Sequence, residues 1–312
     1  MSEFKIQKAT REGVKPLIVP YSESGCGKTM SSLLLARGLA GPDGKIVLAD
    51  SESRRGSLYA DVIPGGFETF DLCQPFSPAR YIEAIDAIEA SGAAVGVLDS
   101  GSHEWEGPGG VNDLATQNEE RSGKPGLHNW RQPKMEHAKF VQRLLRTKIP
   151  FIICLRAKFK TRQGKDERGK TAIIKDDHVS PIQAEDFIFE ATAHFEILPD
   201  HSIRLTKVSH PTLGACFPSV GPITIQHGEL LARWCATPGK PPAPADPLDA
   251  LKLKLWRALA PVRGKDKWGA PEAEAWLRSK TILPDGVTIA QLTADDLQVV
   301  IDKTEISLDE AQ

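Results

Sequence analysis

The sequence predicts an α/β fold, a mainly parallel sheet flanked by helices and followed by a small helical C-terminal module. From residue 1 to about 236, short apolar runs alternate with longer helical patterns, which is typical of a parallel sheet. A glycine-rich turn directly follows the first apolar run. Five prolines within 237–247 then predict a linker, because such a segment holds neither a helix nor a central strand. We therefore expect a sheet domain over 1–236, a linker over 237–247 and a helical module over 248–312.

The individual strands and helices follow from apolar patterning. Each expected strand is a short apolar run, and each expected helix carries apolar side chains at helical spacing. The predicted strands are 14–21, 45–50, 94–99 and 149–155, with an antiparallel pair within 194–208. The predicted helices are 29–39 and 78–92 in the sheet domain, and 248–262, 270–280 and 292–303 in the module. Thr293 with Asp296 three residues on predicts a cap at the start of the last helix.

Composition limits the class of protein. The chain has 312 residues, of which 40% are hydrophobic and 26% charged, and its formal net charge is -2, so any nucleic-acid surface must be local. The 5 cysteines are scattered and never spaced C-x-x-C, which argues against a zinc ribbon or a disulfide scaffold. We find neither an apolar run long enough to span a membrane nor a signal peptide. We therefore expect a cytoplasmic protein without membrane association.

Residues 21–29, YSESGCGKT, match the phosphate-binding pattern G-x-x-x-x-G-K-S/T except at its first position, where Ser22 replaces glycine. A strand precedes the loop and a helix follows it, so backbone N–H groups and the helix dipole would bind an anion there. Lys28 would reach the β- and γ-phosphates of a nucleotide, and the Thr29 hydroxyl would bind Mg²⁺. Ser22 adds no bulk that a phosphate would meet, so we expect a working loop rather than a chance match in an ordinary turn. The expected nucleotide-binding residues are Ser24, Gly25, Cys26, Gly27, Lys28, Thr29 and Met30.

Two acidic residues at neighbouring strand ends extend this site. Asp99 ends the strand 94–99 and is the expected residue for orienting Mg²⁺. Because Ser100 rather than glutamate follows it, the base for hydrolysis must come from elsewhere. Glu52 follows the strand 45–50, at the edge where a water attacking the γ-phosphate could be oriented. The alternative for Glu52 is an ordinary loop carboxylate.

The stretch from Asp50 to Trp105 resembles the RecA recombinase core. Asp50-Ser51-Glu52 is similar to the D-x-E strand end that supplies the family's catalytic glutamate. Tyr59-Ala60 is similar to the pair in which a tyrosine lies against adenine, and residues 71–100 resemble the family's cysteine-glutamine strand end, helix and V-x-V-D-S strand. The resemblance covers about 14–210 and implies a RecA-like P-loop sheet with ATP and Mg²⁺ as cofactors, Glu52 as catalytic residue and Tyr59 at the base. In size the chain is most similar to the short RecA-like ATPases that phages encode beside annealing and recombination proteins.

RecA-like proteins hold single-stranded DNA with two loops that follow the third and fourth core strands. The residues after Asp99 are expected to form the first, a long polar glycine-rich loop with Trp105 and Trp130 available for stacking on bases. The second, 156–175, holds eight Lys or Arg residues against two acidic ones. Such a charge in this position favours contact with a nucleic-acid backbone, whereas the alternative is a solvated charged hairpin. The expected DNA-binding residues are Trp105, Lys158, Lys160, Arg162, Lys165, Arg168 and Lys170.

The fourth strand end departs from the family. RecA proteins carry asparagine-glutamine there, and the glutamine relays the γ-phosphate state to the DNA loop, whereas this chain has Leu155-Arg156. Arg156 or Lys158 would then sense phosphate by charge, and we count Arg156 among the catalytic residues. Lys207 matches lysines that RecA proteins present to a neighbouring subunit's γ-phosphate, which implies a homo-oligomer with active sites at subunit interfaces. The alternative for Lys207 is a solvated lysine at a strand end.

The function that these residues favour is DNA-stimulated, Mg²⁺-dependent ATP hydrolysis in phage or mobile-element recombination, annealing or replication. Single-stranded DNA is the expected partner, and a phage recombination or single-strand-binding protein is a further candidate. The alternative is a nucleotide-dependent regulatory adaptor that binds a protein through its C-terminal helices. Residues 292–312, with six acidic residues and one lysine, could compete with DNA or bind a basic partner. A P-loop kinase is disfavoured for two reasons. The sequence lacks the cluster of arginines that such kinases carry in their lid, and it has the D-x-E strand end at Asp50-Ser51-Glu52.

Overall fold

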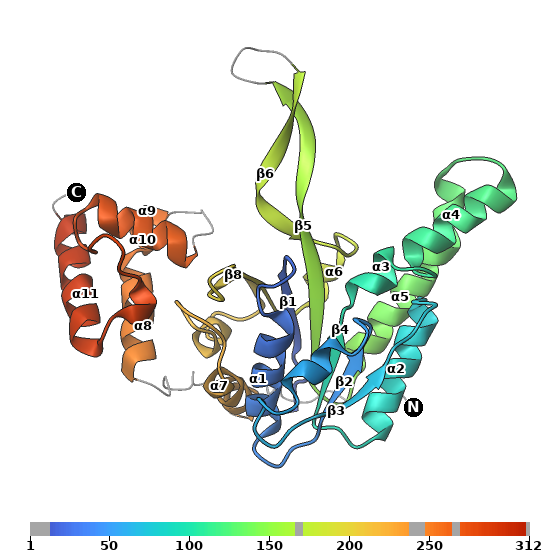
Figure 1. Cartoon of the computed structure of the whole chain (residues 1–312), viewed down its shortest axis with the longest axis horizontal. Helices are drawn as coiled ribbons and strands as arrows, with labels where there is room; N and C mark the ends of the chain where they lie inside the picture. Colours follow the sequence, from blue (N-terminus) through green and yellow to red (C-terminus); the bar gives the residue numbers. More distant parts are fainter. Residues whose placement is uncertain (1–12, 166–170, 237–246, 264–268, 310–312) are drawn as a thin grey trace, which may run out of the picture.

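The computed structural model describes residues 13–165, 171–236, 247–263 and 269–309, and Figure 1 shows a central sheet with helices around it. The sheet has eight strands, of which seven follow the order β3-β2-β4-β5-β1-β7-β8, while β6 pairs with β5. The strands are β1 (Leu17–Ser22), β2 (Ile46–Asp50), β3 (Glu68–Asp71), β4 (Val95–Asp99), β5 (Phe151–Lys165), β6 (Thr171–Pro181), β7 (Ala193–Ile197) and β8 (Ile203–Val208). The predicted α/β fold class, a mainly parallel sheet flanked by helices and followed by a small helical module, is confirmed.

The directions of the strands determine at which edge of the sheet the candidate site lies. The pairs β2–β3, β2–β4, β4–β5, β1–β5 and β1–β7 are parallel, whereas β8 runs antiparallel to β7. The predicted antiparallel pair within 194–208 is thereby confirmed. The sequence pattern did not predict β3, because its ETFD side chains are mostly exposed and show no apolar run. The carboxyl ends of β1, β2 and β4 lie at one edge of the sheet, beside Leu155 and Arg156 in the middle of β5, and this edge is where ligands bind in open α/β sheets.

Helices cover both faces of the sheet. One face packs against α1 (Lys28–Ala40) and α7 (Ile225–Ala236), and the other packs against α2 (Pro78–Ala90) and α5 (Arg131–Leu145). The helices α1 and α7 cross closely at Gly38 and Gly228. A Cβ on Gly38 would lie 1.9 Å from the Ile225 carbonyl oxygen, so only glycine permits this approach. The residues that lead into α7 are therefore held against the helix that follows the phosphate loop.

The segment after β4 is helical, so the expected long polar loop is wrong over most of its length. It contains α3 (Ser102–Glu106), α4 (Val111–Ser122) and a 3₁₀ turn, η2 (Leu127–Trp130). In α4 only Val111 and Ala115 are buried, so the sequence shows no apolar periodicity that would predict a helix. Its ends are marked by Gly110 and by Gly123, which has φ 66° and caps the last turn.

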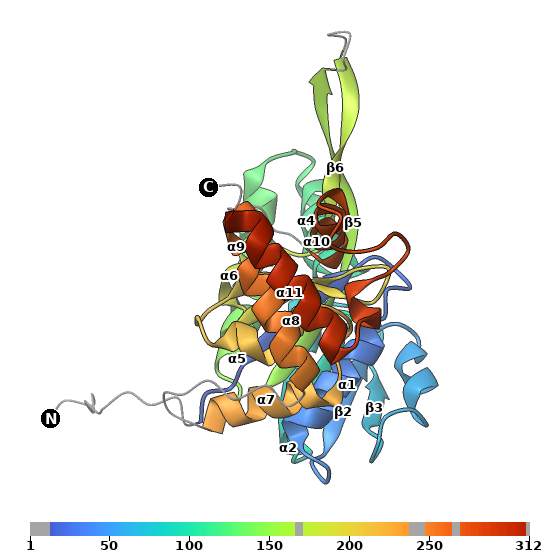
Figure 2. The same cartoon turned by 90° about the vertical axis from the view of Figure 1, so that its left-hand side faces the viewer.

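The basic segment forms an antiparallel hairpin that continues β5 well past its predicted end at Leu155. The strands β5 and β6 pair from Ala157 with Pro181 to Lys165 with Thr171. Both views show this hairpin projecting away from the body of the protein (Figures 1 and 2). Of the predicted DNA-binding residues, Arg162 and Lys165 lie on β5, whereas Arg168 and Lys170 lie outside the described residues.

The C-terminal helices form a module with its own apolar core. Its helices are α8 (Pro247–Ala258), α9 (Ala260–Arg263), α10 (Ala270–Ser279) and α11 (Ala294–Asp309), with a 3₁₀ turn, η4 (Ile289–Gln291). The predicted cap of the last helix is confirmed, since Asp296 N–H donates to Thr293 Oγ1 at 3.3 Å. Val220 of the preceding domain is buried within the module's core cluster. The predicted linker lies outside the described residues up to 246, and the described part of the chain contains no helix long and apolar enough to cross a membrane.

Candidate nucleotide site

A cavity of about 1120 Å³ opens at the carboxyl edge of the sheet. One part of its lining comes from the phosphate loop and the start of α1. The ends of β2 and β4, the middle of β5 and the 3₁₀ turn η1 (Arg55–Tyr59) add a second part. The β7–β8 turn and the residues before α7 complete it. The predicted nucleotide-binding residues that line the cavity are Ser24, Gly25, Gly27, Lys28, Thr29, Met30 and Tyr59.

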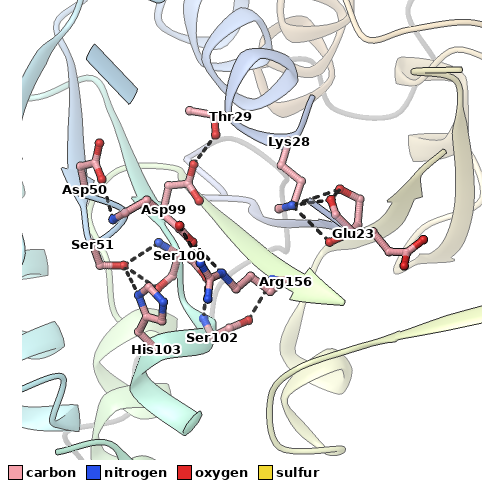
Figure 3. Close-up of polar contacts among 12 residues, drawn as sticks. Glu23, Lys28, Thr29, Asp50, Ser51, Asp99, Ser100, Ser102, His103 and Arg156 are labelled. Atoms are coloured by element: carbon pink, nitrogen blue, oxygen red, sulfur yellow. Dashed lines mark hydrogen bonds and ion pairs between the residues drawn. The ribbon is translucent and has the colours of Figure 1, made fainter. Parts of the chain in front are cut away.

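The phosphate loop holds its lysine through the residue that replaces the first glycine. Lys28 Nζ donates to the Ser22 carbonyl (3.1 Å), to Ser22 Oγ (3.2 Å) and to the Glu23 carbonyl (2.9 Å), as Figure 3 shows in part. Ser22 is fully buried and does not adopt a positive φ, so its backbone does not require glycine. Gly25 and Gly27 do adopt φ 88°, which favours glycine at both positions. Ser22 thus gives the loop an additional acceptor for the ammonium group.

Thr29 and Asp99 form the part of the cavity that fits Mg²⁺. The Thr29 hydroxyl donates to Asp99 Oδ2 at 2.5 Å, so two oxygens of the kind that Mg²⁺ prefers lie side by side. Burial raises the pKa of Asp99 to about 6, Thr29 opposes this by donating to it, and the nearby Glu52 carboxylate raises it further. A buried carboxylate with a raised pKa is stabilised by a neighbouring cation. The residues present therefore fit the expected metal.

Glu52 forms a bidentate ion pair with Arg156. Arg156 Nε donates to Glu52 Oε1 at 2.7 Å, and its Nη2 donates to Oε2 at 2.8 Å. The Glu52 side chain is 14% exposed and that of Arg156 is 47% exposed, so the pair lies at the mouth of the cavity. Both Glu52 oxygens are occupied. The structure thus joins the predicted base, at the end of β2, to the predicted sensor, on β5.

The backbone of Arg156 belongs to the root of the hairpin. Its N–H donates to Ser102 Oγ at 2.9 Å, and its carbonyl accepts from Ile182 N–H at 2.7 Å. Lys158, the other candidate sensor, does not line the cavity and instead pairs with Glu106 at 2.8 Å. Of the two candidates, Arg156 lines the cavity and Lys158 does not.

A hydrogen-bond network behind the carboxylates was not predicted. Ser51 Oγ accepts from Ser100 N–H at 2.8 Å and lies 2.8 Å from His103 Nδ1, and the His103 ring stacks on Phe76 with centroids 4.8 Å apart. Burial, followed by the positive charge of Arg156, lowers the pKa of His103. This network links the ends of β2 and β4, so Glu52 and Asp99 sit on one rigid frame. In the sequence, this network is indicated only by Ser51 and Ser100, the serines that directly follow Asp50 and Asp99.

Lys207 does not line the cavity. Its Nζ donates to the carbonyls of Ile188 (3.0 Å), Phe189 (2.5 Å) and Ala191 (2.8 Å), at the end of the short helix α6 (Phe187–Glu190). Burial lowers the pKa of Lys207. Within one protomer this lysine caps a helix, and any contact with a neighbouring subunit would have to replace three hydrogen bonds.

The predicted aromatic contacts to DNA are packed against the protein. Trp105 is half-buried, with its ring centroid 6.5 Å from that of Trp130 and 5.2 Å from that of His137, which it meets edge-on. His137 Nδ1 lies 2.9 Å from Oε1 of the fully buried Glu104. This cluster ties α3 to α5 beside the hairpin root.

On one side of the cavity, none of the lining residues was predicted from the sequence. This side consists of the β7–β8 turn, which contributes Asp200 and His201, and of the segment before α7. Cys26 is buried, and its carbonyl lies 3.0 Å from His201 Nδ1. The residues that line the cavity and were not predicted to bind nucleotide are Ser31, Leu34, Arg55, Leu58, Ala157, Ile182, Asp200, His201, Pro222, Ile223 and Thr224.

Comparisons with known proteins do not indicate a function for this chain. No protein-family model matches the chain, and no curated protein matches it. Among solved structures it is similar to a prototypical ATPase of the type III secretion system of pathogenic bacteria, with 12% identity, a TM-score of 0.36, and coverage of 93% of this chain and 78% of that one. It is also similar to the ATPase EscN, solved with its central stalk EscO from enteropathogenic E. coli, with 12% identity, a TM-score of 0.37 and coverage of 93% and 66%. Both TM-scores lie below 0.5, so neither likeness indicates what this chain does.

Proposed function

We propose that this chain is a Mg²⁺-dependent ATPase whose hydrolysis is controlled by single-stranded DNA bound at the β5–β6 hairpin. The observation that carries the proposal is the Arg156–Glu52 ion pair, because it links the root of a basic hairpin to the carboxylate best placed to act as base. In the cell we place this activity in the cytoplasm, in recombination, annealing or replication of a phage or mobile element. A recombination or single-strand-binding protein is the protein partner that such a role favours.

The hydrolytic roles follow from the positions of four side chains. Lys28 neutralises the β- and γ-phosphates once it exchanges its present carbonyl partners for them. Thr29 and Asp99 hold Mg²⁺, which when bound neutralises charge on the phosphates. Glu52 orients the attacking water and accepts its proton. Tyr59 lines the same cavity and is proposed to lie against the adenine.

The ion pair gives this site a resting state. A carboxylate with both oxygens bound by a guanidinium group cannot at the same time orient a water. The γ-phosphate of ATP is a second anion that Arg156 can bind. Arg156 therefore inhibits the base while it is paired with Glu52, and it stabilises charge on the phosphate once it has moved.

The hairpin supplies the control by DNA. Lys158 and Lys160 pair with Glu106 (2.8 Å) and Glu185 (3.0 Å), but these pairs are exposed, so each is worth about 0–1 kcal/mol and is easily exchanged for a phosphate contact. Arg156 precedes these lysines on β5 and is held by backbone bonds at the hairpin root. A shift of the hairpin on DNA therefore moves Arg156 relative to Glu52.

The test is the steady-state ATPase rate with and without single-stranded DNA over a salt series. We expect stimulation that falls steeply with salt, because each DNA phosphate that the protein neutralises adds roughly -0.7 to the slope of the logarithm of the binding constant against the logarithm of the salt concentration. Lys158→Ala and Lys160→Ala should each make this slope less steep. Lys139→Ala is the matched control, since Lys139 is an exposed lysine on α5 paired with Glu136 at 2.9 Å. Rates that are equal with and without DNA would contradict the proposal and favour the nucleotide-dependent adaptor.

We propose in addition that the active form is a homo-oligomer with sites at subunit interfaces. Lys207 is the residue that a neighbour would contribute, since it lies outside the cavity of its own protomer. Mixing a Lys28→Ala protein with a Lys207→Ala protein tests this. Activity recovered in the mixture would support shared sites, and a mixture no more active than its components would contradict them.

A further inference from the structure

The turn between β7 and β8 is built to hold one histidine against the phosphate loop. Two backbone bonds close the turn, from His201 N–H to the Leu198 carbonyl and from Leu198 N–H to the Ser202 carbonyl, each 2.9 Å. Asp200 Oδ1 fixes it further by accepting from Ser202 N–H at 3.0 Å and from Ser202 Oγ at 2.7 Å. Within this frame His201 adopts φ 65°, a left-handed conformation that is uncommon outside glycine and is found mainly with Asn, Asp and His.

The His201 ring contacts the phosphate loop at its backbone. Nδ1 lies 3.0 Å from the carbonyl oxygen of Cys26. Since a carbonyl only accepts hydrogen bonds, Nδ1 carries the proton and donates it. The ring also lies so close to Gly27 that a Cβ there would be 3.1 Å from Nδ1. The histidine thus both binds and packs against the peptide between Cys26 and Gly27.

This contact fixes the direction of one N–H group. In a trans peptide the C=O and the following N–H point in opposite directions. With the Cys26 carbonyl bound to His201, the Gly27 N–H is directed away from the histidine, and rotation of this peptide would break the hydrogen bond. Gly27 adopts φ 88° in the loop whose N–H groups bind phosphate, and such a flexible residue would otherwise let this peptide rotate.

The turn is supported from the outside by the C-terminal module. Gly269, directly before α10, lies so close to the turn that a Cβ on it would be 3.1 Å from Leu198 Cδ1. Val220, in the same core cluster as the module's helices, immediately precedes the residues that line the cavity before α7. Both segments on this side of the cavity therefore rest against the module.

We propose that His201 is a positioning residue for nucleotide binding, which orients the Cys26–Gly27 peptide so that the Gly27 N–H can donate to a phosphate. The inference rests on the proposed function only in that the ligand is a nucleoside triphosphate. It requires neither DNA control nor a role for Arg156. His201 acts through the loop, so its loss changes affinity for nucleotide more than the rate of the chemical step.

Two substitutions separate the hydrogen bond from the backbone conformation. His201→Gly keeps the left-handed turn but removes the donor. His201→Asn keeps both, because asparagine tolerates positive φ and its amide nitrogen is as many bonds from Cβ as Nδ1 is. Binding of a fluorescent ATP analogue with Mg²⁺ to the full chain should weaken by about five- to tenfold in His201→Gly, as expected for the removal of one hydrogen bond, and by less than about twofold in His201→Asn. KM should rise in His201→Gly while kcat stays within about twofold of the wild type.

The unfolding midpoint of each variant is measured alongside, so that a misfolded protein is recognised. His201→Gly that folds and binds the analogue as tightly as the wild type would overturn the inference. A folded His201→Asn protein that binds the analogue as weakly as His201→Gly would also overturn the inference. A wild-type protein that binds no ATP analogue at all would instead overturn the proposed function.

Discussion

The nucleotide cavity has two unlike walls. The catalytic wall consists of Glu52, Asp99 and Arg156, charged side chains that lie at one edge of the sheet on or directly after the neighbouring parallel strands β2, β4 and β5. The bracing wall consists of the β7–β8 turn with His201 and of residues 222–224 before α7, and its clearest contact with the phosphate loop is a hydrogen bond to backbone. Under the proposed function, the catalytic wall acts on the phosphate and the bracing wall holds the loop that binds it.

This difference predicts opposite kinetic effects. Changes at Glu52 and Arg156 should lower turnover and leave nucleotide binding nearly intact, because these side chains act on the reacting phosphate. Changes at His201 should weaken binding and leave turnover nearly intact, because this residue acts through the loop. A protein in which Glu52 and His201 affect the same parameter would remove the distinction.

The largest effect is expected for Glu52→Gln. The amide keeps the shape of the side chain but cannot accept a proton from water, so turnover should fall by about 10²- to 10⁴-fold. The dissociation constant for ATP should stay within about threefold of the wild type. Single-turnover hydrolysis and equilibrium binding measure the two quantities. Glu83→Gln on α2, an exposed glutamate paired with Arg80 at 3.1 Å, is the matched control and should change neither.

A Glu52→Gln protein with normal turnover would show that the base lies elsewhere. The serine and histidine that join the ends of β2 and β4 would then be the next residues to change, since His103 lies 2.8 Å from Ser51 in the same frame.

An intermediate effect is expected from pH. Burial raises the pKa of Asp99 from 3.8 to about 6, so the folded protein takes up a proton at a pH where the unfolded chain does not. Through this group the free energy of unfolding falls as the pH rises through that range. Binding of Mg²⁺ has the opposite dependence, because it needs the charged carboxylate. Mg²⁺-dependent binding of ATP should therefore weaken as the pH falls through about 6.

Titrations with and without Mg²⁺ over this pH range measure the effect. In the wild type, the Mg²⁺-dependent gain in affinity for ATP should change near pH 6. This change should be absent in Asp99→Asn, which carries no ionisable group at that position. A change of the same size in Asp99→Asn would assign it to a different residue.

The smallest effect is expected for Ser22→Gly, which restores the usual phosphate-binding pattern. Ser22 Oγ is one of three acceptors that hold Lys28, so its removal should free Lys28 for phosphate and tighten ATP binding by about two- to threefold. The added glycine should lower the unfolding midpoint slightly, since glycine loses more backbone entropy on folding. Weaker binding by fivefold or more would mean that the hydroxyl contributes to the bound state.

The sequence predicted the catalytic wall and missed the bracing wall for physical reasons. Glu52, Asp99 and Lys28 are residue types that the chemistry requires, and they follow apolar strand patterns that place them at one sheet edge. His201 acts by donating to a backbone carbonyl, which many residue types can do, so no spacing indicates it. Arg156 was expected at the phosphate, but its pairing with Glu52 depends on the order β2-β4-β5, which the sequence did not specify.

The fold shows the same division. The apolar strands and the antiparallel pair within 194–208 were predicted, because a buried strand needs an apolar run. The helix α4 was not, because only two of its side chains, Val111 and Ala115, are buried and give no apolar periodicity. The continuation of β5 into the hairpin was not predicted either. Its sequence is charged and has no apolar run, and the strand is defined by its pairing with β6.

The central claim is that Arg156 links the hairpin to Glu52. Its most direct test is the ratio of kcat with single-stranded DNA to kcat without it, at saturating ATP, in the wild type and in Arg156→Ala. We expect a ratio well above one in the wild type and a ratio near one in Arg156→Ala, with binding of ATP and of DNA both retained. An Arg156→Ala protein that keeps the wild-type ratio would contradict the claim.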